Sequence, residues 1–461
     1  MNPLEYHSDV LIIGAGPAGL AAAKAALEAG CEVDLVDDNF QSGGQIWRGG
    51  GHLQKDQRAK QLAQVLTQSN QLRCHFQSKL IHIGGHKDHF TAVLDHTQTP
   101  ASASSRILAK RIIIATGARE VLLPFHGWTL PGVTGAGGLQ ALAKTGYPVE
   151  GKRIVVAGTG PLLLAVAASL VERGAIVTHI VEQSSFAKLR RFTWQLFASP
   201  SKLKQAMQLA WTLRKQKYWC DSFVIEARGT EQLTSVTILK NGIQHSIDCD
   251  YLACGYGLAP NLEIAAGLGG EIDYHEADQT NGAMPSIRVD ETQESSIAGV
   301  YCAGETTGVG GVDLSLAEGC IAGHAAALSL TYDKHSDSTS SLAEQELAEA
   351  KKQRKHWQKF AQDLHQAFQL RSELKQLCRS DTIVCRCEDV RFEELQTQSD
   401  WRSAKLHTRC GMGACQGRVC GNANHILFGW KRDVGRLPLQ ATSIHNLLAI
   451  QARSTQDEFT E

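Results

Sequence analysis

A glycine-rich turn near the N-terminus places the strongest limit on how this chain can fold. The turn Gly14–Gly19, with the sequence GAGPAG, follows the apolar run Val10–Ile13 and precedes an alanine-rich stretch from about Ala18 to Ala29. A second strand-like run, Cys31–Asp37, comes next. Strand, turn, helix and strand in this order predict a βαβ unit, and therefore a parallel sheet with a nucleotide-binding turn.

The three glycines of this turn have separate roles. Gly14 permits the tight turn, Gly16 lets the backbone approach a pyrophosphate, and Gly19 lets helix and strand pack closely. Exposed N–H groups at the start of the helix would bind the phosphates. An acid at the end of the following strand can accept hydrogen bonds from a ribose, and Asp37 and Asp38 are alternatives for that contact. The predicted nucleotide contacts in this unit are Gly14, Gly16, Pro17, Ala18, Gly19, Asp37 and Asp38.

A second copy of the pattern begins at Arg153. The strand-like run Arg153–Ala157 leads into Gly158–Leu163 (GTGPLL), a helix from about Leu162 to Arg173 and a strand that ends at Glu182. This repeat predicts a duplicated dinucleotide-binding domain. Leu163 occupies the position of the third glycine, so it either pushes the helix away from its strand or needs a small residue opposite it. Gly158, Gly160 and Glu182 are the candidate contacts, and NAD, another adenine nucleotide and no ligand at all remain open alternatives.

Length and charge limit the remaining possibilities. A chain of 461 residues predicts two or three domains. Its formal net charge of −1 gives no field that would attract nucleic acid or an acidic membrane. We expect an α/β fold with two Rossmann-like dinucleotide-binding domains and a small C-terminal domain. The predicted divisions are residues 1–125 together with 286–332, residues 126–285, a linker and long charged helix over 333–379, and residues 380–461. The linker is expected over Asp333–Ser341 and the charged helix over about Leu342–Leu377, and a basic helical stretch is expected from about Phe186 to Lys217.

The N-terminus carries no basic segment followed by an apolar run and a cleavage site, and the apolar runs are of strand length. We therefore expect no transmembrane segment and a cytoplasmic location.

Five of the 13 cysteines crowd between Cys385 and Cys420. Cys385 and Cys387 form CxC, Cys415 and Cys420 form CxxxxC, and Cys410 is a spare thiol between them. Four thiolates are the usual ligands of a [2Fe–2S] cluster, and the neighbouring glycines would let backbone N–H groups turn toward its sulfurs. A zinc site with four cysteine ligands and a set of buried, unligated thiols are the competing interpretations.

Four segments together resemble the two-dinucleotide-domain flavoprotein superfamily: Gly14–Gly19, Gly43–Gln45, Ile114–Ala118 and Val300–Glu305. The resemblance implies FAD at the first glycine turn, with Gly44 and Gln45 along the flavin, Thr116 and Gly117 crossing between the domains, and Gly304 and Glu305 near the pyrophosphate and ribityl chain. Asp is usual where this chain has Glu305, which is one methylene longer. No cysteine pair lies in the segments where the disulfide reductases of this superfamily carry one, so that activity is not expected.

The segments Val384–Asp389 and Thr408–Cys420 resemble the bacterioferritin-associated-ferredoxin-like [2Fe–2S] module. Joined to a flavoprotein body, they are similar to the large subunit of the hydrogen cyanide synthase, opine oxidase and D-hydroxyproline or proline dehydrogenase family. The loop Pro124–Val133 also fits that family. The resemblance implies Cys385, Cys387, Cys415 and Cys420 as cluster ligands. It also implies a smaller FAD-dependent partner subunit that oxidises an amine or amino acid, a quinone or other acceptor, and peripheral attachment to the inner face of the membrane through partners.

Two other functions compete with this hypothesis. One is a stand-alone NAD(P)H-dependent ferredoxin reductase, and the other is a non-catalytic iron–sulfur scaffold. The sequence shows no acid–base pair or nucleophile, so the catalytic residues stay unknown. Among the isolated histidines His7, His126, His275 and His407, only His126 lies in the family-like loop. Lys188–Arg191, Lys202 and Lys204 form a basic stretch that is either a solvated helix face or a surface for an acidic partner.

Overall fold

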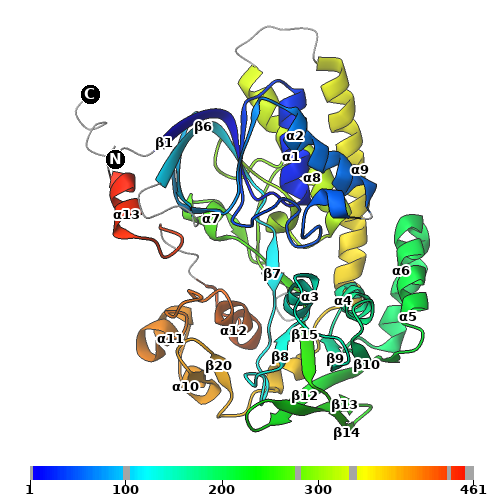
Figure 1. The fold of residues 1–461 in the computed structure, drawn as a ribbon. Helices are drawn as coiled ribbons and strands as arrows, with labels where there is room; N and C mark the ends of the chain where they lie inside the picture. Colours follow the sequence, from blue (N-terminus) through cyan, green and yellow to red (C-terminus); the bar gives the residue numbers. More distant parts are fainter. Residues whose placement is uncertain are drawn as a thin grey trace.

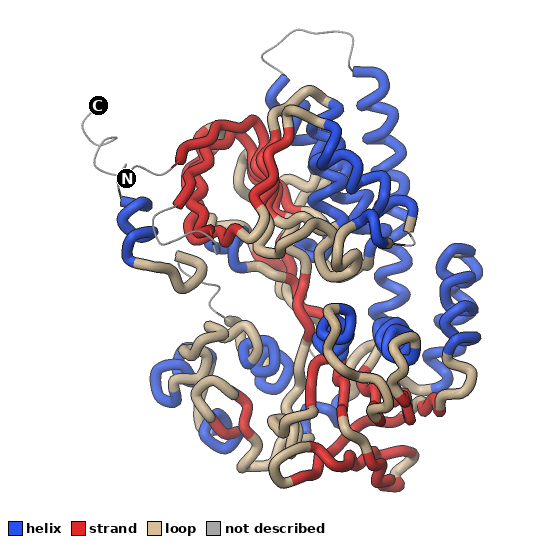
Figure 2. The backbone as a smooth tube through the Cα atoms, viewed as in Figure 1, coloured by secondary structure: helices blue, strands red, loops and turns tan. Residues whose placement is uncertain are grey.

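The computed structural model describes residues 4–54, 56–96, 104–275, 282–331, 340–432 and 438–451. Figure 1 shows a unit with the N-terminal strands and α1, a second unit below it, and a small C-terminal group of helices beside the second unit. Helices and strands alternate in both larger units (Figure 2), so the predicted α/β class with two dinucleotide-binding units is confirmed.

A seven-stranded sheet forms the first unit. Its strand order is β3-β2-β1-β6-β5-β4, and β19 also pairs with β6. The apolar residues Val10–Ile13 are buried on both faces of β1, as expected of a parallel sheet covered on both sides. The strands are β1 (Leu4–Ile13), β2 (Val33–Val36), β3 (Leu72–His75), β4 (Ser78–His86), β5 (His89–His96), β6 (Ser104–Ile114) and β19 (Val300–Cys302).

Small residues allow the helices of this unit to pack backbone against backbone. A Cβ on Gly319 of α8 would lie 2.1 Å from the carbonyl oxygen of Ala18 in α1, and one on Gly323 would lie 2.4 Å from that of Ala22. No side chain larger than hydrogen fits at either position, so α1 and α8 are held at a fixed crossing. The helices are η1 (Gly51–Leu53), α1 (Pro17–Glu28), α2 (Gln57–Gln68), η4 (Gly304–Thr307) and α8 (Val312–Thr331).

The second unit repeats the arrangement with a parallel sheet in the order β11-β10-β9-β15-β8. The antiparallel pair of β7 (Ala118–Glu120) and β16 (Leu258–Pro260) joins the two units, and Figure 1 shows β7 running between them. The sheet strands are β8 (Val133–Gly135), β9 (Arg153–Gly158), β10 (Ile176–Glu182), β11 (Lys217–Trp219) and β15 (Tyr251–Gly255). A separate antiparallel sheet contains β12 (Ser222–Gly229), β13 (Leu233–Lys240) and β14 (Ile243–Asp248). The helices are α3 (Ala136–Lys144), α4 (Pro161–Val171), α5 (Phe186–Gln195), η2 (Leu196–Ala198) and α6 (Pro200–Thr212).

The long charged helix predicted over Leu342–Leu377 ends earlier, at Ala367. This helix, α9 (Ser340–Ala367), packs along α8 and reaches down to the second unit, as Figure 1 shows. The basic stretch predicted over Phe186–Lys217 also breaks into α5 and α6, because Ser199 and Pro200 end one helix and start the next. Of the predicted linker Asp333–Ser341, only Ser340 and Ser341 lie within the described residues, and they begin α9.

The cysteine-rich end folds into short elements around its own small core, which includes Val384, Leu395, Trp401 and Cys410. These elements are β20 (Ile383–Cys385), β21 (Val390–Arg391), α10 (Phe392–Gln396), α11 (Trp401–Thr408) and α12 (Cys420–Phe428). Before them, η5 (Ser372–Gln376) adds Leu374 to the core of the second unit, and after them α13 (Ile444–Gln451) packs against β5 of the first sheet. The elements α7 (Glu263–Gly267), β17 (Ile272–Asp273) and β18 (Ser286–Ile287) also contribute to the core of the first unit.

Candidate functional site

The first glycine turn has the geometry that its sequence predicts. Gly14 has a φ of +105°, and a Cβ there would lie 2.3 Å from the carbonyl oxygen of Ala115. A Cβ on Gly19 would lie 1.8 Å from the carbonyl oxygen of Gly14, so only glycine lets α1 start this close to β1. A Cβ on Gly16, in contrast, would meet nothing nearer than 3.9 Å. The turn is therefore open on the side where a pyrophosphate would approach.

This turn faces a cavity of about 3170 Å³ between the two units. Most of the predicted FAD contacts line it, namely Gly14, Gly16, Pro17, Ala18, Asp37, Asp38, Gly44, Gln45, Thr116, Gly117 and Glu305. Gly19 and Gly304 are not lining residues, because Gly19 packs against Gly14 and Gly304 packs against Ala18. The cavity is large enough for a dinucleotide, and the predicted contacts surround it from separate segments of the first unit.

Asp37 is held at the edge of this cavity by its own loop. Its carboxylate accepts hydrogen bonds from the N–H groups of Ala15 (2.6 Å) and Asn39 (2.8 Å). The neighbouring Asp38 lies beside it, and burial together with the charge of Asp37 raises the pKa of Asp38. Both acids remain on the cavity wall, so both remain candidates for the ribose contact.

Two carboxyl groups lie close to the end of the last strand of the first sheet, the half-buried Glu305 and the buried Glu318. Burial raises the pKa of Glu305 to about 7, and it raises that of Glu318 to about 7 as well. Glu318 accepts hydrogen bonds from Gly304 N (3.0 Å) and Thr307 Oγ1 (2.9 Å), so it fixes the turn that carries Glu305. We did not predict Glu318 from the sequence. The available signal was a lone acid inside the otherwise small and apolar stretch of α8.

The second glycine turn is arranged differently. The Glu182 carboxylate accepts hydrogen bonds from Thr159 Oγ1 (2.8 Å), Gly160 N (2.8 Å) and Ser184 N (2.9 Å). Only 1% of Glu182 is exposed, and it does not line the cavity, whereas Asp37 does. Burial raises the pKa of Glu182. The acid that would contact a ribose is thus enclosed by its own loop.

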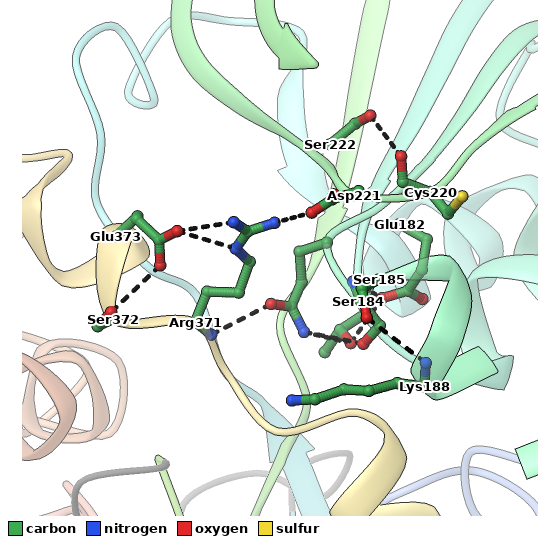
Figure 3. A network of polar contacts seen from close by, with 12 residues as sticks. Glu182, Ser184, Ser185, Lys188, Cys220, Asp221, Ser222, Arg371, Ser372 and Glu373 are labelled. Atoms are coloured by element: carbon green, nitrogen blue, oxygen red, sulfur yellow. Dashed lines mark hydrogen bonds and ion pairs between the residues drawn. The ribbon is translucent and has the colours of Figure 1, made fainter. Parts of the chain in front are cut away.

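The end of α9 covers this second turn. Side chains of the loop that follows β10, beside this turn, donate to carbonyl oxygens at and just beyond the end of the helix. Ser184 Oγ donates to the carbonyl of Ala367 (3.0 Å), and Gln183 Nε2 donates to that of Gln369 (3.0 Å). Figure 3 shows Glu182 and Ser184 close to Arg371, which follows α9. The Arg371 N–H donates to Gln183 Oε1 (3.1 Å), and its guanidinium pairs with Asp221 and Glu373.

The five clustered cysteines come together in the C-terminal region. One sulfur each from Cys385, Cys410 and Cys420 lies within 4.8 Å of the others, and all three residues are buried. Cys415 contacts Cys420 on one side and Cys387 on the other. The structure therefore groups the four predicted ligands with Cys410, the thiol that the sequence leaves as a spare.

Backbone N–H groups point at these sulfurs, as the glycines predict. Cys385 accepts hydrogen bonds from the backbone of Gly411 and Glu388. The indole of Trp401 packs directly against two of the glycines, since a Cβ on Gly411 or Gly417 would lie 2.6 or 2.9 Å from it. Thiolate ligands with N–H donors around them suit an iron–sulfur cluster, and a group of cysteines that can hold a metal also suits zinc.

The predicted histidines do not come together. His126 lies 3.7 Å from Asp381 and 4.0 Å from Glu226, at the contact with the cysteine-rich region and away from the cavity. His275 lines the cavity and bonds to Ser286, while His7 and His407 lie elsewhere on the surface. Within the basic stretch, Lys202 forms an ion pair with Asp313 (2.5 Å), so it is not part of a solvated face.

Two dinucleotide-binding units that share one cavity, with an open glycine turn inside it, define a flavin-dependent oxidoreductase. The chain belongs to the pyridine nucleotide-disulphide oxidoreductase family, whose model matches residues 8–327. All 13 cysteines lie within the described residues, and none of them forms a disulfide there.

The chain is related to components of several oxidases. It is 29% identical to an opine oxidase subunit of Rhizobium meliloti (strain 1021), covering 92% of this chain and 93% of that one. It is 28% identical to the HcnB subunit of hydrogen cyanide synthase from Pseudomonas aeruginosa, over 89% of this chain and 90% of that one. The predicted resemblance to subunits of opine oxidase and hydrogen cyanide synthase is confirmed, whereas the [2Fe–2S] module stays a prediction.

Among solved structures, the fold is similar to L-proline dehydrogenase from P. horikoshii, with a TM-score of 0.66 and 18% identity over 97% of this chain and 80% of that one. Thioredoxin reductase from T. acidophilum has a TM-score of 0.53 and 21% identity over 70% of this chain and 99% of that one. In the described part of this chain, no helix combines the length and apolar character needed to span a bilayer.

Proposed function

We propose that this chain is the FAD- and [2Fe–2S]-containing subunit of a multi-subunit dehydrogenase that acts on the C–N bond of an amine or amino acid. One observation carries the proposal: the cavity that holds the first glycine turn also reaches Ala414 and Cys415 of the cysteine cluster. A flavin at the first glycine turn and a metal centre at the cysteine cluster would lie along the same cavity. The named relatives are subunits of opine oxidase, hydrogen cyanide synthase and sarcosine oxidase, which supports this class of reaction.

The residues of the first unit fit FAD. The open side of Gly16 and the N-terminus of α1 suit the pyrophosphate, and Asp37 or Asp38 suits the ribose. Glu305 lines the cavity and has a raised pKa, so near neutral pH its carboxyl group would be able to donate a hydrogen bond to a hydroxyl of the ribityl chain as well as to accept one. Gly44, Gln45, Thr116, Gly117 and the turn at Gly304 complete the proposed FAD contacts.

The C-terminal residues fit an iron–sulfur cluster held by Cys385, Cys387, Cys415 and Cys420. The CxC spacing and the N–H donors to sulfur favour iron over zinc. With both groups bound, the flavin would supply two-electron chemistry and the cluster one-electron chemistry, so the chain would suit conversion between the two.

The second unit supports a partner-dependent role. Glu182 is enclosed and the end of α9 covers its loop, so we propose that NADH does not reduce this chain. The alternative of a stand-alone NAD(P)H-dependent reductase would need that site open. Electrons would then come from a smaller flavoprotein subunit and leave to a quinone or other acceptor. We place the complex in the cytoplasm, with peripheral attachment at the inner face of the membrane through its partners.

We also keep the proposed domain boundaries, namely residues 1–125 with 286–332, residues 126–285, residues 333–379 and residues 380–461. The first two correspond to the two sheets, and the last contains the cysteine core.

The experiment that tests this function is co-expression with the smaller flavoprotein subunit encoded alongside, followed by metal and flavin analysis. We expect FAD and iron with acid-labile sulfide in this chain. We also expect dye reduction by one member of a panel of proline, hydroxyproline, opines, sarcosine and glycine, only when the partner is present. Reduction of the isolated chain by NADH would support the alternative function. A colourless protein with zinc and no flavin would overturn the proposal.

A further inference from the structure

Glu263, at the start of α7, lies between three arginines from distant parts of the chain. Arg119 makes two hydrogen bonds to its carboxylate, at 2.7 and 2.8 Å. Arg432 donates to Glu263 Oε1 at 2.8 Å, and Arg418 Nε lies 3.9 Å from the same oxygen. The Glu263 side chain is only 12% exposed. One carboxylate therefore joins β7, beside the cavity, to the cysteine-rich region.

We call Glu263 and its arginine partners the bridge, and we call Thr116–Gly117, between β6 and β7, the hinge. On the flavin side, the bridge continues to the hinge. Arg119 Nε donates to Asn261 Oδ1 at 2.6 Å. Asn261 in turn bonds through its side chain to the carbonyl of Thr116 (2.7 Å) and through its backbone N–H to the carbonyl of Gly117 (2.9 Å). The hinge that lines the cavity is thus connected through Asn261 to Arg119, the partner of Glu263.

On the cysteine side, the bridge ends at the loop Cys415–Cys420. Arg432 donates to the carbonyl of Gly417 at 3.2 Å. Its side chain also fills the space beside Gly421, where a Cβ would lie 2.5 Å from Arg432 Cδ. Arg418, within the loop, lines the same cavity as Cys415 and Glu263. The position of the loop therefore depends on where Glu263 holds Arg432.

The charge balance of the bridge follows from the same contacts. Burial alone would raise the pKa of Glu263, but Arg119 and Arg432 outweigh it and lower the pKa to about 2. The carboxylate is charged at neutral pH and offsets part of the positive charge of three guanidinium groups. Positive charge close to an iron–sulfur cluster stabilises its more negative reduced form and raises its reduction potential.

We infer that Glu263 is a positioning residue that fastens the cysteine loop to the flavin hinge and lowers the reduction potential of the cluster by offsetting the arginines beside it. The inference rests on the proposed function, because it requires a cluster at the cysteine loop.

The test is an EPR-monitored redox titration of the purified complex, with dithionite as reductant, for two substitutions at the two ends of one ion pair. We expect Glu263→Gln to raise the midpoint potential of the cluster, because it removes a negative charge. We expect Arg432→Gln to lower it, because it removes a positive charge. Glu271→Gln is the matched control, since Glu271 forms an exposed ion pair with Arg288 and should leave the potential unchanged.

The directions of the two potential shifts distinguish an effect of charge from simple loosening of the loop. A loop that is only loosened would shift the potential in the same direction in both variants, and that result would overturn the inference. Unchanged potentials in both variants, with iron and FAD retained, would also overturn it while leaving the proposed function intact. If Glu263→Gln fails to fold, Arg432→Gln alone can still overturn the inference, because a raised or unchanged potential in that variant would contradict it. Absence of iron from the parent protein would instead refute the proposed function.

Discussion

The buried carboxyl of Glu318 should make the stability of the flavin-binding unit depend on pH. Its pKa is about 7 in the folded protein, against an ordinary value of 4.5. Above pH 4.5 the carboxyl group ionises in the unfolded chain, where water solvates it, while the folded protein keeps it protonated. The free energy of unfolding therefore falls until the pH passes 7. Between pH 5 and pH 8 this loss is about 2.5 kcal/mol for one such group.

Glu318→Gln should abolish this part of the pH dependence. The amide oxygen can still accept from Gly304 and Thr307, and no proton is involved. We therefore expect the variant to resemble the parent at pH 5 and to exceed it in melting temperature by several degrees at pH 8, measured on the holoprotein by differential scanning calorimetry. The exposed Glu349→Gln is the control and should show no such trend. A difference between variant and parent that stays constant from pH 5 to pH 8 would refute the assignment of a raised pKa to Glu318.

Three further predictions concern the bound groups. Gly19→Ala should abolish FAD retention, because its Cβ would lie 1.8 Å from a backbone oxygen. The control Gly30→Ala meets nothing within 4 Å but sits at a φ of +82°, so it should lose some stability and keep its FAD; flavin absorbance after gel filtration measures both. NADH at millimolar concentration should neither bind, by isothermal titration calorimetry, nor bleach the flavin, because Glu182 is enclosed; micromolar affinity would contradict this. Cys387→Ser should lose iron, and Cys410→Ser should retain it with an altered EPR spectrum. The reverse outcome, measured by iron analysis, would make Cys410 the fourth ligand.

Local patterns in the sequence were enough to predict the fold. The apolar run at Val10–Ile13 and the glycines of the first turn specify strand, turn and helix within about 20 residues, where chain connectivity alone limits the geometry. The same holds for the second copy at Arg153–Glu182. The clustered cysteines were found for the same reason, since the spacing within each motif brings its thiols together.

The remaining features depend on contacts between residues far apart in sequence. Arg432 meets Glu263 across 169 residues, and no periodicity or motif links the two. The early end of α9 also has a distant cause. No glycine or proline follows Ala367 to stop the helix, and carbonyl oxygens at its end accept hydrogen bonds from Gln183 and Ser184, in the loop that follows β10. Helix propensity within α9 could not predict this end, because the capping side chains come from the second unit.

That shared cap makes the molecule hard to divide. A chain cut after α8 would leave the buried hydroxyl of Ser184 without its acceptor at Ala367, and the buried amide of Gln183 would lose one of its three acceptors. The second unit would then lose stability even though its own sheet was untouched. Exchange of domains between related oxidases should therefore succeed only when α9 and the loop that follows β10 are exchanged together.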